Sequence, residues 1–143
     1  MTNTQAYRGE RLGLPAAGPG SLARLGPRIA AFLVDIVASG LVAAAFVAIG
    51  RPHSGDATTH LPGSWSLIPF ALDYIIGLVL GGRTLGMYLF GLRVIRVERG
   101  ASISVLTATV RTVLLALLIP ALVWDRDGRG LHDRLTSTAV VNA

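Results

Sequence analysis

An acidic residue, Asp35, lies inside an apolar run that extends from Ile29 to Ile49. At about 1.5 Å per residue, a helix over this run would be about 31 Å long, which is enough to cross the hydrocarbon core of a bilayer. An ionised carboxylate inside a membrane helix costs roughly 2.5 to 3.5 kcal/mol on insertion scales, so Asp35 needs a partner or a proton. We therefore expect an integral membrane protein that keeps its buried charge in contact with other protein groups.

Composition supports this class. Of the 143 residues, 52% are hydrophobic, and the mean hydropathy is +0.59. The polar residues 1–25 are rich in Gly and Pro and predict a cytoplasmic tail, followed by one membrane domain over residues 26–143. The net charge of +5 comes from Arg residues that mostly flank apolar runs, so we expect contact with anionic lipid headgroups and no nucleic acid. The absence of Cys excludes disulfides and thiolate catalysis, and nothing in the chain implies a cofactor.

Three apolar segments dominate the membrane domain, at about residues 29–49, 65–82 and 105–124. The first two predict transmembrane helices. The third either spans the membrane or enters and returns, because Pro120 interrupts it. The fold class predicted is an all-α membrane protein with two firm transmembrane helices and this third segment.

Between the second and third apolar segments, the composition changes. Leu85 to Leu89 predicts a short interfacial helix, and the β-branched Leu92 to Val97 predicts a strand. A second strand is predicted at Thr136 to Val141. These two strands would form a small cytoplasmic two-stranded β element.

The Arg distribution predicts the topology. The N-terminal tail with the first helical turn carries four Arg residues, the segment after the second apolar run carries four, and the first loop carries only Arg51. This bias predicts a multi-pass protein of the bacterial inner membrane with a cytoplasmic N-terminus. Three full spans would place the C-terminal tail outside, whereas strand pairing and the Arg residues of that tail favour the cytoplasmic side.

Three motifs carry a family resemblance. They are Gly26-Pro27-Arg28-Ile29-Ala30-Ala31-Phe32-Leu33-Val34-Asp35, then Thr84-Leu85-Gly86-Met87 with Gly91-Leu92-Arg93-Val94, and finally Leu131-His132-Asp133-Arg134-Leu135 with Thr138-Ala139-Val140-Val141. Together they resemble the RDD family of bacterial membrane proteins, named for one Arg and two Asp. The resemblance implies that the motif residues are Arg28, Asp35, Thr84, Gly86, His132 and Asp133. It implies a poorly defined molecular role, for which transport of an unidentified solute or ion is the usual suggestion. Met87 stands where the family usually has Lys or Arg.

Four charged residues are expected at similar depth in the bilayer: Arg28, Asp35, Asp73 and Arg111. Two nearby carboxylates favour one shared proton, because like charges oppose the second ionisation. One interpretation is an intramembrane charged network that handles a proton or cation. The alternative is a structural ion pair between Asp35 and Arg111, with Asp73 protonated or reaching toward the interface.

Other residues carry weaker hypotheses. Spacings of four between Gly77 and Gly81 and between Gly82 and Gly86 permit close helix packing or oligomerisation. Asp133 is expected to pin the C-terminal tail against Arg residues of the segment after the second apolar run. His53, Asp56 and His60 lie in a polar loop without further ligands, so we expect no metal site.

No nucleophile elbow, phosphate-binding loop or zinc-protease motif is present in the sequence, and we expect no enzyme. The leading hypothesis is a small membrane protein that contributes to transport of a proton, cation or small solute as an oligomer. The alternative is an accessory or scaffold subunit whose buried charges are purely structural. Its partners would be the lipid bilayer and either further copies of itself or another membrane protein.

Overall fold

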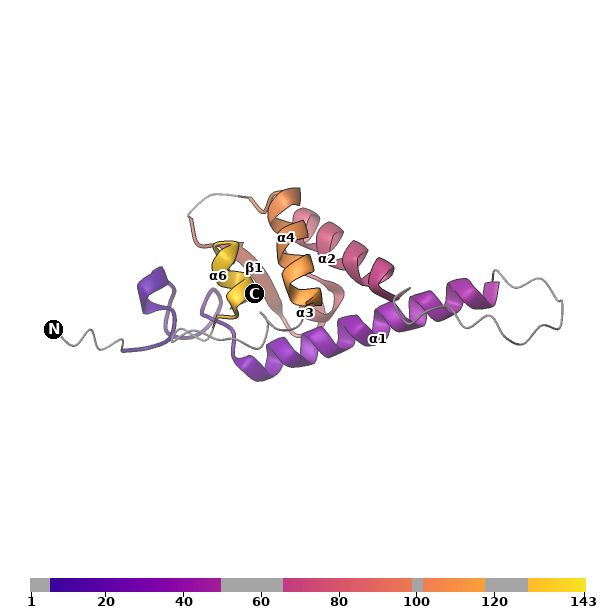
Figure 1. Cartoon of the computed structure of the whole chain (residues 1–143). Helices are drawn as coiled ribbons and strands as arrows, with labels where there is room; N and C mark the ends of the chain where they lie inside the picture. Colours follow the sequence, from indigo (N-terminus) through magenta and orange to yellow (C-terminus); the bar gives the residue numbers. More distant parts are fainter. Residues whose placement is uncertain (1–5, 50–65, 99–101, 118–128) are drawn as a thin grey trace.

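The computed structural model describes residues 6–49, 66–98, 102–117 and 129–143 (Figure 1). Its elements in chain order are η1 (Glu10–Leu12), α1 (Leu25–Ile49), α2 (Leu67–Gly81), α3 (Leu85–Leu89), β1 (Leu92–Arg96), α4 (Val105–Ala116), α6 (Leu131–Leu135) and β2 (Thr138–Asn142). The mostly helical fold class and the small two-stranded sheet are confirmed.

Helix α1 is the one helix among the described residues that is long and apolar enough to cross a membrane, with a mean hydropathy of 2.4. Its 25 residues would rise about 37 Å. The second half of α1 extends beyond the other elements (Figure 1), and Leu41, Phe46 and Ile49 are exposed there. A helix with large apolar side chains on its open surface is suited to a lipid environment.

The prediction of a second firm transmembrane helix is not confirmed. Helix α2 has 15 residues and α4 has 12, so they rise only about 22 Å and 18 Å. Helix α2 ends because Gly82 adopts the left-handed conformation with φ 67°, and its N–H bonds the carbonyls of Gly77 and Leu78. Trp65, the expected start of this segment, lies outside the described residues.

Strands β1 and β2 pair antiparallel, with Leu92 opposite Asn142 and Arg96 opposite Thr138. The predicted pairing of these two segments is therefore confirmed. Part of the N-terminal tail joins the other edge of β2, because the Ala23 N–H donates to the Val140 carbonyl at 2.9 Å.

The start of α1 and the end of α2 also lie at the sheet. Helix α1 begins two residues after Ala23, and the Val94 N–H donates to the Gly82 carbonyl, at the end of α2, at 2.6 Å. The start of α1, the end of α2 and the C-terminus thus lie on one side of the fold.

The elements before and after the third apolar segment meet at this sheet. Strand β1 precedes α4, and β2 follows α6, yet the two strands are hydrogen-bonded neighbours. Three full membrane crossings are incompatible with this pairing, so the arrangement agrees with a segment that enters and returns or lies along the interface. Pro120, the expected point of reversal, lies outside the described residues.

A small core fixes α2 against its neighbours. Phe70, Tyr74 and Leu78 follow at intervals of four and are all buried, as one face of a helix requires. The Phe70 ring packs edge-on against Phe32 of α1, with ring centroids 5.9 Å apart. Leu115 of α4 packs against the same core. Helix α2 contacts both α1 and α4.

Reporter fusions before Met1 and after Ala143 test the topology. We expect both reporters on the same side of the membrane, because Ala23 and Val140 are hydrogen-bonded to each other. The measurement is alkaline phosphatase activity and green fluorescence of each fusion in intact cells. From the Arg distribution, we expect both ends in the cytoplasm. Opposite patterns for the two ends would contradict this fold.

Candidate functional site

Two buried polar clusters lie on the side of the fold near the sheet. The acid cluster consists of Asp35, Asp73, Thr84 and Gly86. The arginine cluster consists of Arg28, Arg111, His132, Asp133 and Thr138.

The acid cluster begins with Asp35, which is only 1% exposed. It shares the buried face of α1 with Ala31 and Ser39, which lie four residues before and after it on the same side of the helix. Its Oδ2 accepts a hydrogen bond from the Thr84 hydroxyl at 2.7 Å, and its Oδ1 accepts one from the Gly86 N–H at 2.6 Å. Asp35 therefore holds the first turn of α3 against α1.

The Thr84 hydroxyl both accepts and donates a hydrogen bond. It is the N-cap of α3, where its Oγ1 accepts a hydrogen bond from the Met87 N–H at 3.3 Å. The same hydroxyl donates its proton to Asp35. Capping a helix and satisfying a buried acid are thus combined in one side chain, which is fully buried itself.

Gly86 permits the close approach of α3 to α1. A Cβ atom at this position would collide with the Ala31 carbonyl and would lie 2.8 Å from Asp35 Oδ1. The short helix α3 therefore packs closely against this face of α1. Gly77 is similar, since a Cβ there would lie 2.6 Å from the carbonyl of Arg83 in the same chain.

Asp73 completes the acid cluster from α2. Its Oδ1 accepts a hydrogen bond from the Leu85 N–H at 3.3 Å. Leu85 and Gly86 are adjacent, so the Asp35 and Asp73 carboxyl groups bind consecutive N–H groups and are close enough to interact electrostatically. The second oxygen of Asp73 is buried and has no hydrogen-bond partner among the described residues.

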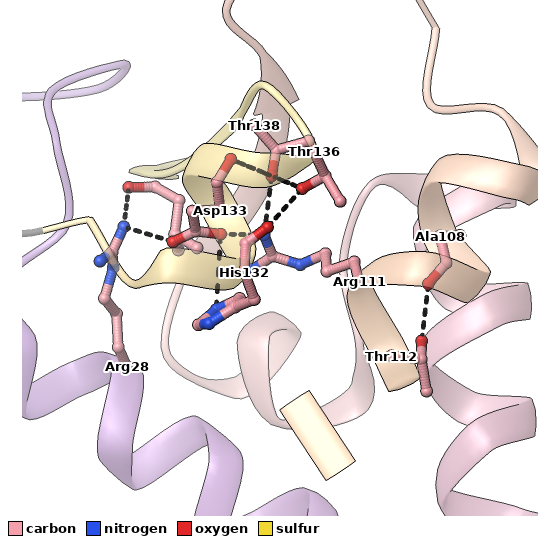
Figure 2. Close-up of polar contacts among 9 residues, drawn as sticks. Arg28, Ala108, Arg111, Thr112, His132, Asp133, Thr136 and Thr138 are labelled. Carbon is pink, nitrogen blue, oxygen red and sulfur yellow. Dashed lines mark hydrogen bonds and ion pairs between the residues drawn. The ribbon is translucent and has the colours of Figure 1, made fainter. Parts of the chain in front are cut away.

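The arginine cluster is centred on Asp133, which is fully buried. Figure 2 shows its carboxylate between two guanidinium groups from distant parts of the chain. Arg111 Nη1 donates to Asp133 Oδ1, and Arg28 Nη2 lies 3.5 Å from Asp133 Oδ2. His132 Nε2 lies 3.6 Å from the same carboxylate.

Both arginines also bind the last strand. Arg111 Nη1 donates to the Thr138 hydroxyl at 2.8 Å, and Arg28 Nη2 donates to the Val140 carbonyl at 3.3 Å. The cluster therefore ties α6 and β2 to α1 and α4. A buried ion pair costs desolvation free energy, so breaking it by removing one partner is strongly destabilising.

The structure corrects two sequence-based pairings. Arg111 does not pair with Asp35 but with Asp133, and Asp133 is pinned by Arg28 and Arg111 instead of by Arg residues after the second apolar run. The four residues Arg28, Asp35, Asp73 and Arg111 are therefore divided between two clusters. Tyr74 lies close enough to both Asp35 and Arg111 to interact electrostatically with each.

Some residues of the two clusters could not be recognised from the sequence pattern. Thr138 and Thr136 hydrogen-bond each other at 2.9 Å beside Asp133, yet Thr is expected in any strand. Tyr74 follows the apolar spacing of its helix and is typical of a core residue. His53, Asp56 and His60 lie outside the described residues. Within those residues, no group of three potential metal ligands occurs.

Comparison with known families assigns the chain. The model of the RDD family matches residues 22–137. The chain belongs to the RDD family. This is a family of membrane proteins, in agreement with the long apolar helix α1. No curated protein and no solved structure matches the chain.

Both clusters contain residues of the motifs that resemble the RDD family. The three residues that match the family's name, Arg28, Asp35 and Asp133, are all part of them. In this RDD protein, Arg28 and Asp133 contact each other across the first and last motifs, whereas Asp35 binds Thr84 and Gly86 of the middle motif. The three motifs are therefore joined in space by these polar contacts.

Asp133→Asn should lower the stability of the folded protein by roughly 3 to 5 kcal/mol, because two guanidinium groups would lose the charge of the carboxylate that they share. The measurement is thermal unfolding in detergent micelles, followed by circular dichroism. Glu98→Gln is the control, since Glu98 is exposed and its ion pair with Arg96 is 3.7 Å long. Equal melting temperatures for the two variants would contradict a structural role for Asp133.

Gly86→Ala should destabilise the protein by roughly 1 to 3 kcal/mol, because the added methyl group forces α3 away from Ala31 and Asp35. Gly40→Ala is the matched control. Gly40 lies in α1, the helix against which α3 packs, and a Cβ there would meet nothing within 4 Å. The control should be neutral or slightly stabilising, since Ala is a better helix former than Gly. Unchanged melting of Gly86→Ala would disprove the close contact.

Proposed function

We propose that this RDD protein is a multi-pass protein of the bacterial inner membrane, with a cytoplasmic N-terminus, that contributes as an oligomer to transport of a proton or small cation. The observation that carries the proposal is the meeting of two carboxyl groups, Asp35 and Asp73, on two apolar helices. Acidic residues in apolar helices mark proton and ion pathways in many membrane proteins.

The two acids have different roles in this proposal. Asp35 is held by donors on both oxygens, which favours a fixed carboxylate. Asp73 receives one backbone hydrogen bond, and its other oxygen is available to a proton or cation. Because two close carboxylates oppose each other's ionisation, the pair would bind one proton or one positive ion in exchange.

Transport by this protein would require an oligomer. Three short apolar segments cannot enclose a path through the membrane by themselves. Leu72, Ile76 and Leu80 are exposed on the outer face of α2, and Leu80 is 82% exposed. These surfaces would contact lipid, further copies of the chain or another membrane protein.

A second candidate function is an accessory or scaffold subunit. It is favoured by the same contacts of Asp35, because a carboxylate that accepts hydrogen bonds from Thr84 and Gly86 also serves to hold α3 in place. In that case the acid cluster would be purely structural. A stoichiometric partner that co-purifies from native membranes would support this second function.

Flux in proteoliposomes tests transport. The parent, Asp73→Asn and Glu98→Gln are reconstituted with an entrapped pH-sensitive dye, and proton entry is recorded after an external pH step. External Na⁺, K⁺ and choline are compared in turn. We expect Asp73→Asn to lower the flux by roughly tenfold or more, because an amide cannot carry the proton while its oxygen can still accept from the Leu85 N–H. Glu98→Gln removes an exposed acid and should leave the flux unchanged.

Thermal unfolding of the same variants separates the two functions. For transport, Asp73→Asn should lose flux with little change in melting temperature. Asp35→Asn should lose stability, because its amide group faces two hydrogen-bond donors. Parent flux equal to that of empty liposomes, or equal flux for the parent and Asp73→Asn, would contradict the transport proposal.

A further inference from the structure

The short helix α3 presents apolar side chains on its outer side. Gly86 and Met87 are buried against the rest of the fold. Tyr88 and Leu89 are 66% and 62% exposed, and the large apolar side chains on either side of them are exposed as well. We call this surface the α3 face; it consists of Leu85, Tyr88, Leu89 and Phe90. Several large apolar groups side by side on a surface indicate contact with a membrane or another protein.

The position of α3 along α1 favours the membrane surface. Helix α3 packs against α1 (Figure 1), where Gly86 meets Ala31 and Asp35. These two residues lie about 9 Å and 15 Å along the axis from Leu25, the first residue of α1. A helix that rises about 37 Å is longer than a hydrocarbon core of about 30 Å. With α1 centred in the bilayer, α3 lies roughly 5 to 11 Å below the boundary between headgroups and hydrocarbon, which is the usual depth of an interfacial helix.

The apolar surface continues from α3 onto α1 at this depth. Ile29 and Leu33 of α1 lie at nearly the same level as α3, and both are exposed. They belong to the helix that is long and apolar enough to cross a membrane. The α3 face thus borders a surface that already suits lipid.

Arginine side chains accompany the α3 face. The Arg83 guanidinium carbon lies 5.5 Å from the centre of the Tyr88 ring. Arg93 is exposed and lies beside the end of α2, where its Nη2 would be 3.9 Å from a Cβ atom at Gly82. Tyr is enriched at bilayer interfaces, and Arg can extend along apolar surface while its charged group stays at headgroup level. Apolar, aromatic and Arg side chains together therefore match the boundary layer of a bilayer.

We propose that the α3 face is inserted into the boundary between headgroups and hydrocarbon, on the side of the membrane where α1 begins. Tyr88 and Leu89 contact the upper part of the acyl chains, and the Arg83 guanidinium lies at the level of the lipid phosphates. The sequence predicted a short interfacial helix here; the structure adds which side chains face outward and which groups lie behind them.

The acid cluster shares the depth of α3. The N–H groups of Leu85 and Gly86 bind Asp73 and Asp35, so both acids lie directly behind the α3 face. Asp35 and Asp73 are therefore close to one surface of the bilayer and not at its centre. This placement does not depend on the proposed transport function.

Spin-label depth measurements test the proposal. The chain has no Cys, so Leu89→Cys introduces a single labelling site on the α3 face. The full chain is labelled with a nitroxide and reconstituted in liposomes, and its accessibility to oxygen and to a water-soluble nickel complex is measured by electron paramagnetic resonance. Val37→Cys, on the exposed side of α1 about 18 Å from Leu25, is the control for the bilayer centre. Glu98→Cys, at an exposed acid, is the control for water.

The label at Leu89 should lie roughly 5 to 10 Å below the lipid phosphates, between the two controls. Accessibility to the nickel complex equal to that of Glu98→Cys would place α3 in water and overturn the proposal. A depth equal to that of Val37→Cys would also overturn it. Protection from both reagents would show that protein and not lipid covers the α3 face.

Fluorescence quenching gives a second measurement with a conservative variant. Tyr88→Trp is made together with Trp65→Phe and Trp124→Phe, so that one Trp remains beneath Arg83. Lipids brominated near the headgroup should quench this Trp at least roughly twofold more strongly than lipids brominated near the end of the acyl chain. Stronger quenching by the deep bromines, or no quenching by either lipid, would overturn the proposal even if Leu89→Cys does not fold.

Discussion

The buried carboxylate of Asp133 holds together parts of the chain that the backbone alone would leave apart. Arg28 comes from the first turn of α1, Arg111 from the middle of α4, and Asp133 from the short helix α6. A charge in an apolar surrounding is tolerated only with a partner and satisfied hydrogen bonds. The pairing of these groups therefore specifies how the C-terminal region returns to the start of the first apolar helix.

The same requirement explains the acid cluster. Asp35 accepts hydrogen bonds from the Thr84 hydroxyl and the Gly86 N–H, and Asp73 accepts one from the Leu85 N–H. The first backbone N–H groups of a helix have no partner within the helix itself. Two helices thus supply acceptors to the first turn of a third. The buried acids and the N–H groups at the start of α3 therefore satisfy each other's hydrogen bonds. The absence of a side chain at Gly86 allows this close contact.

The two clusters differ in the charged groups that they contain. The arginine cluster sets two guanidinium groups around the buried carboxylate of Asp133 and ties α6 and β2 to α1 and α4. The acid cluster has two carboxyl groups and one buried oxygen without a hydrogen-bond partner among the described residues, so it suits a proton or cation. Tyr74 is close to both Asp35 and Arg111, so the two clusters lie in neighbouring parts of one small core.

Several features followed from the sequence by itself. The apolar run predicted α1, and β-branched composition predicted strands β1 and β2 and their pairing. These features depend on local periodicity and on the free energy of burying apolar groups, both of which a sequence contains.

Only the tertiary structure decided which charges pair. Depth along a helix gives one coordinate of a side chain, whereas an ion pair also requires the right direction around the helix and the reach of the side chain. Arg111 and Asp35 were expected at equal depth, but Arg111 is directed toward α6 and meets Asp133. The strand composition indicated that β1 and β2 pair, but the hydrogen bond from Ala23 to Val140 on the other edge of β2 was decided only by the tertiary structure, because local periodicity does not specify which distant segment meets a strand.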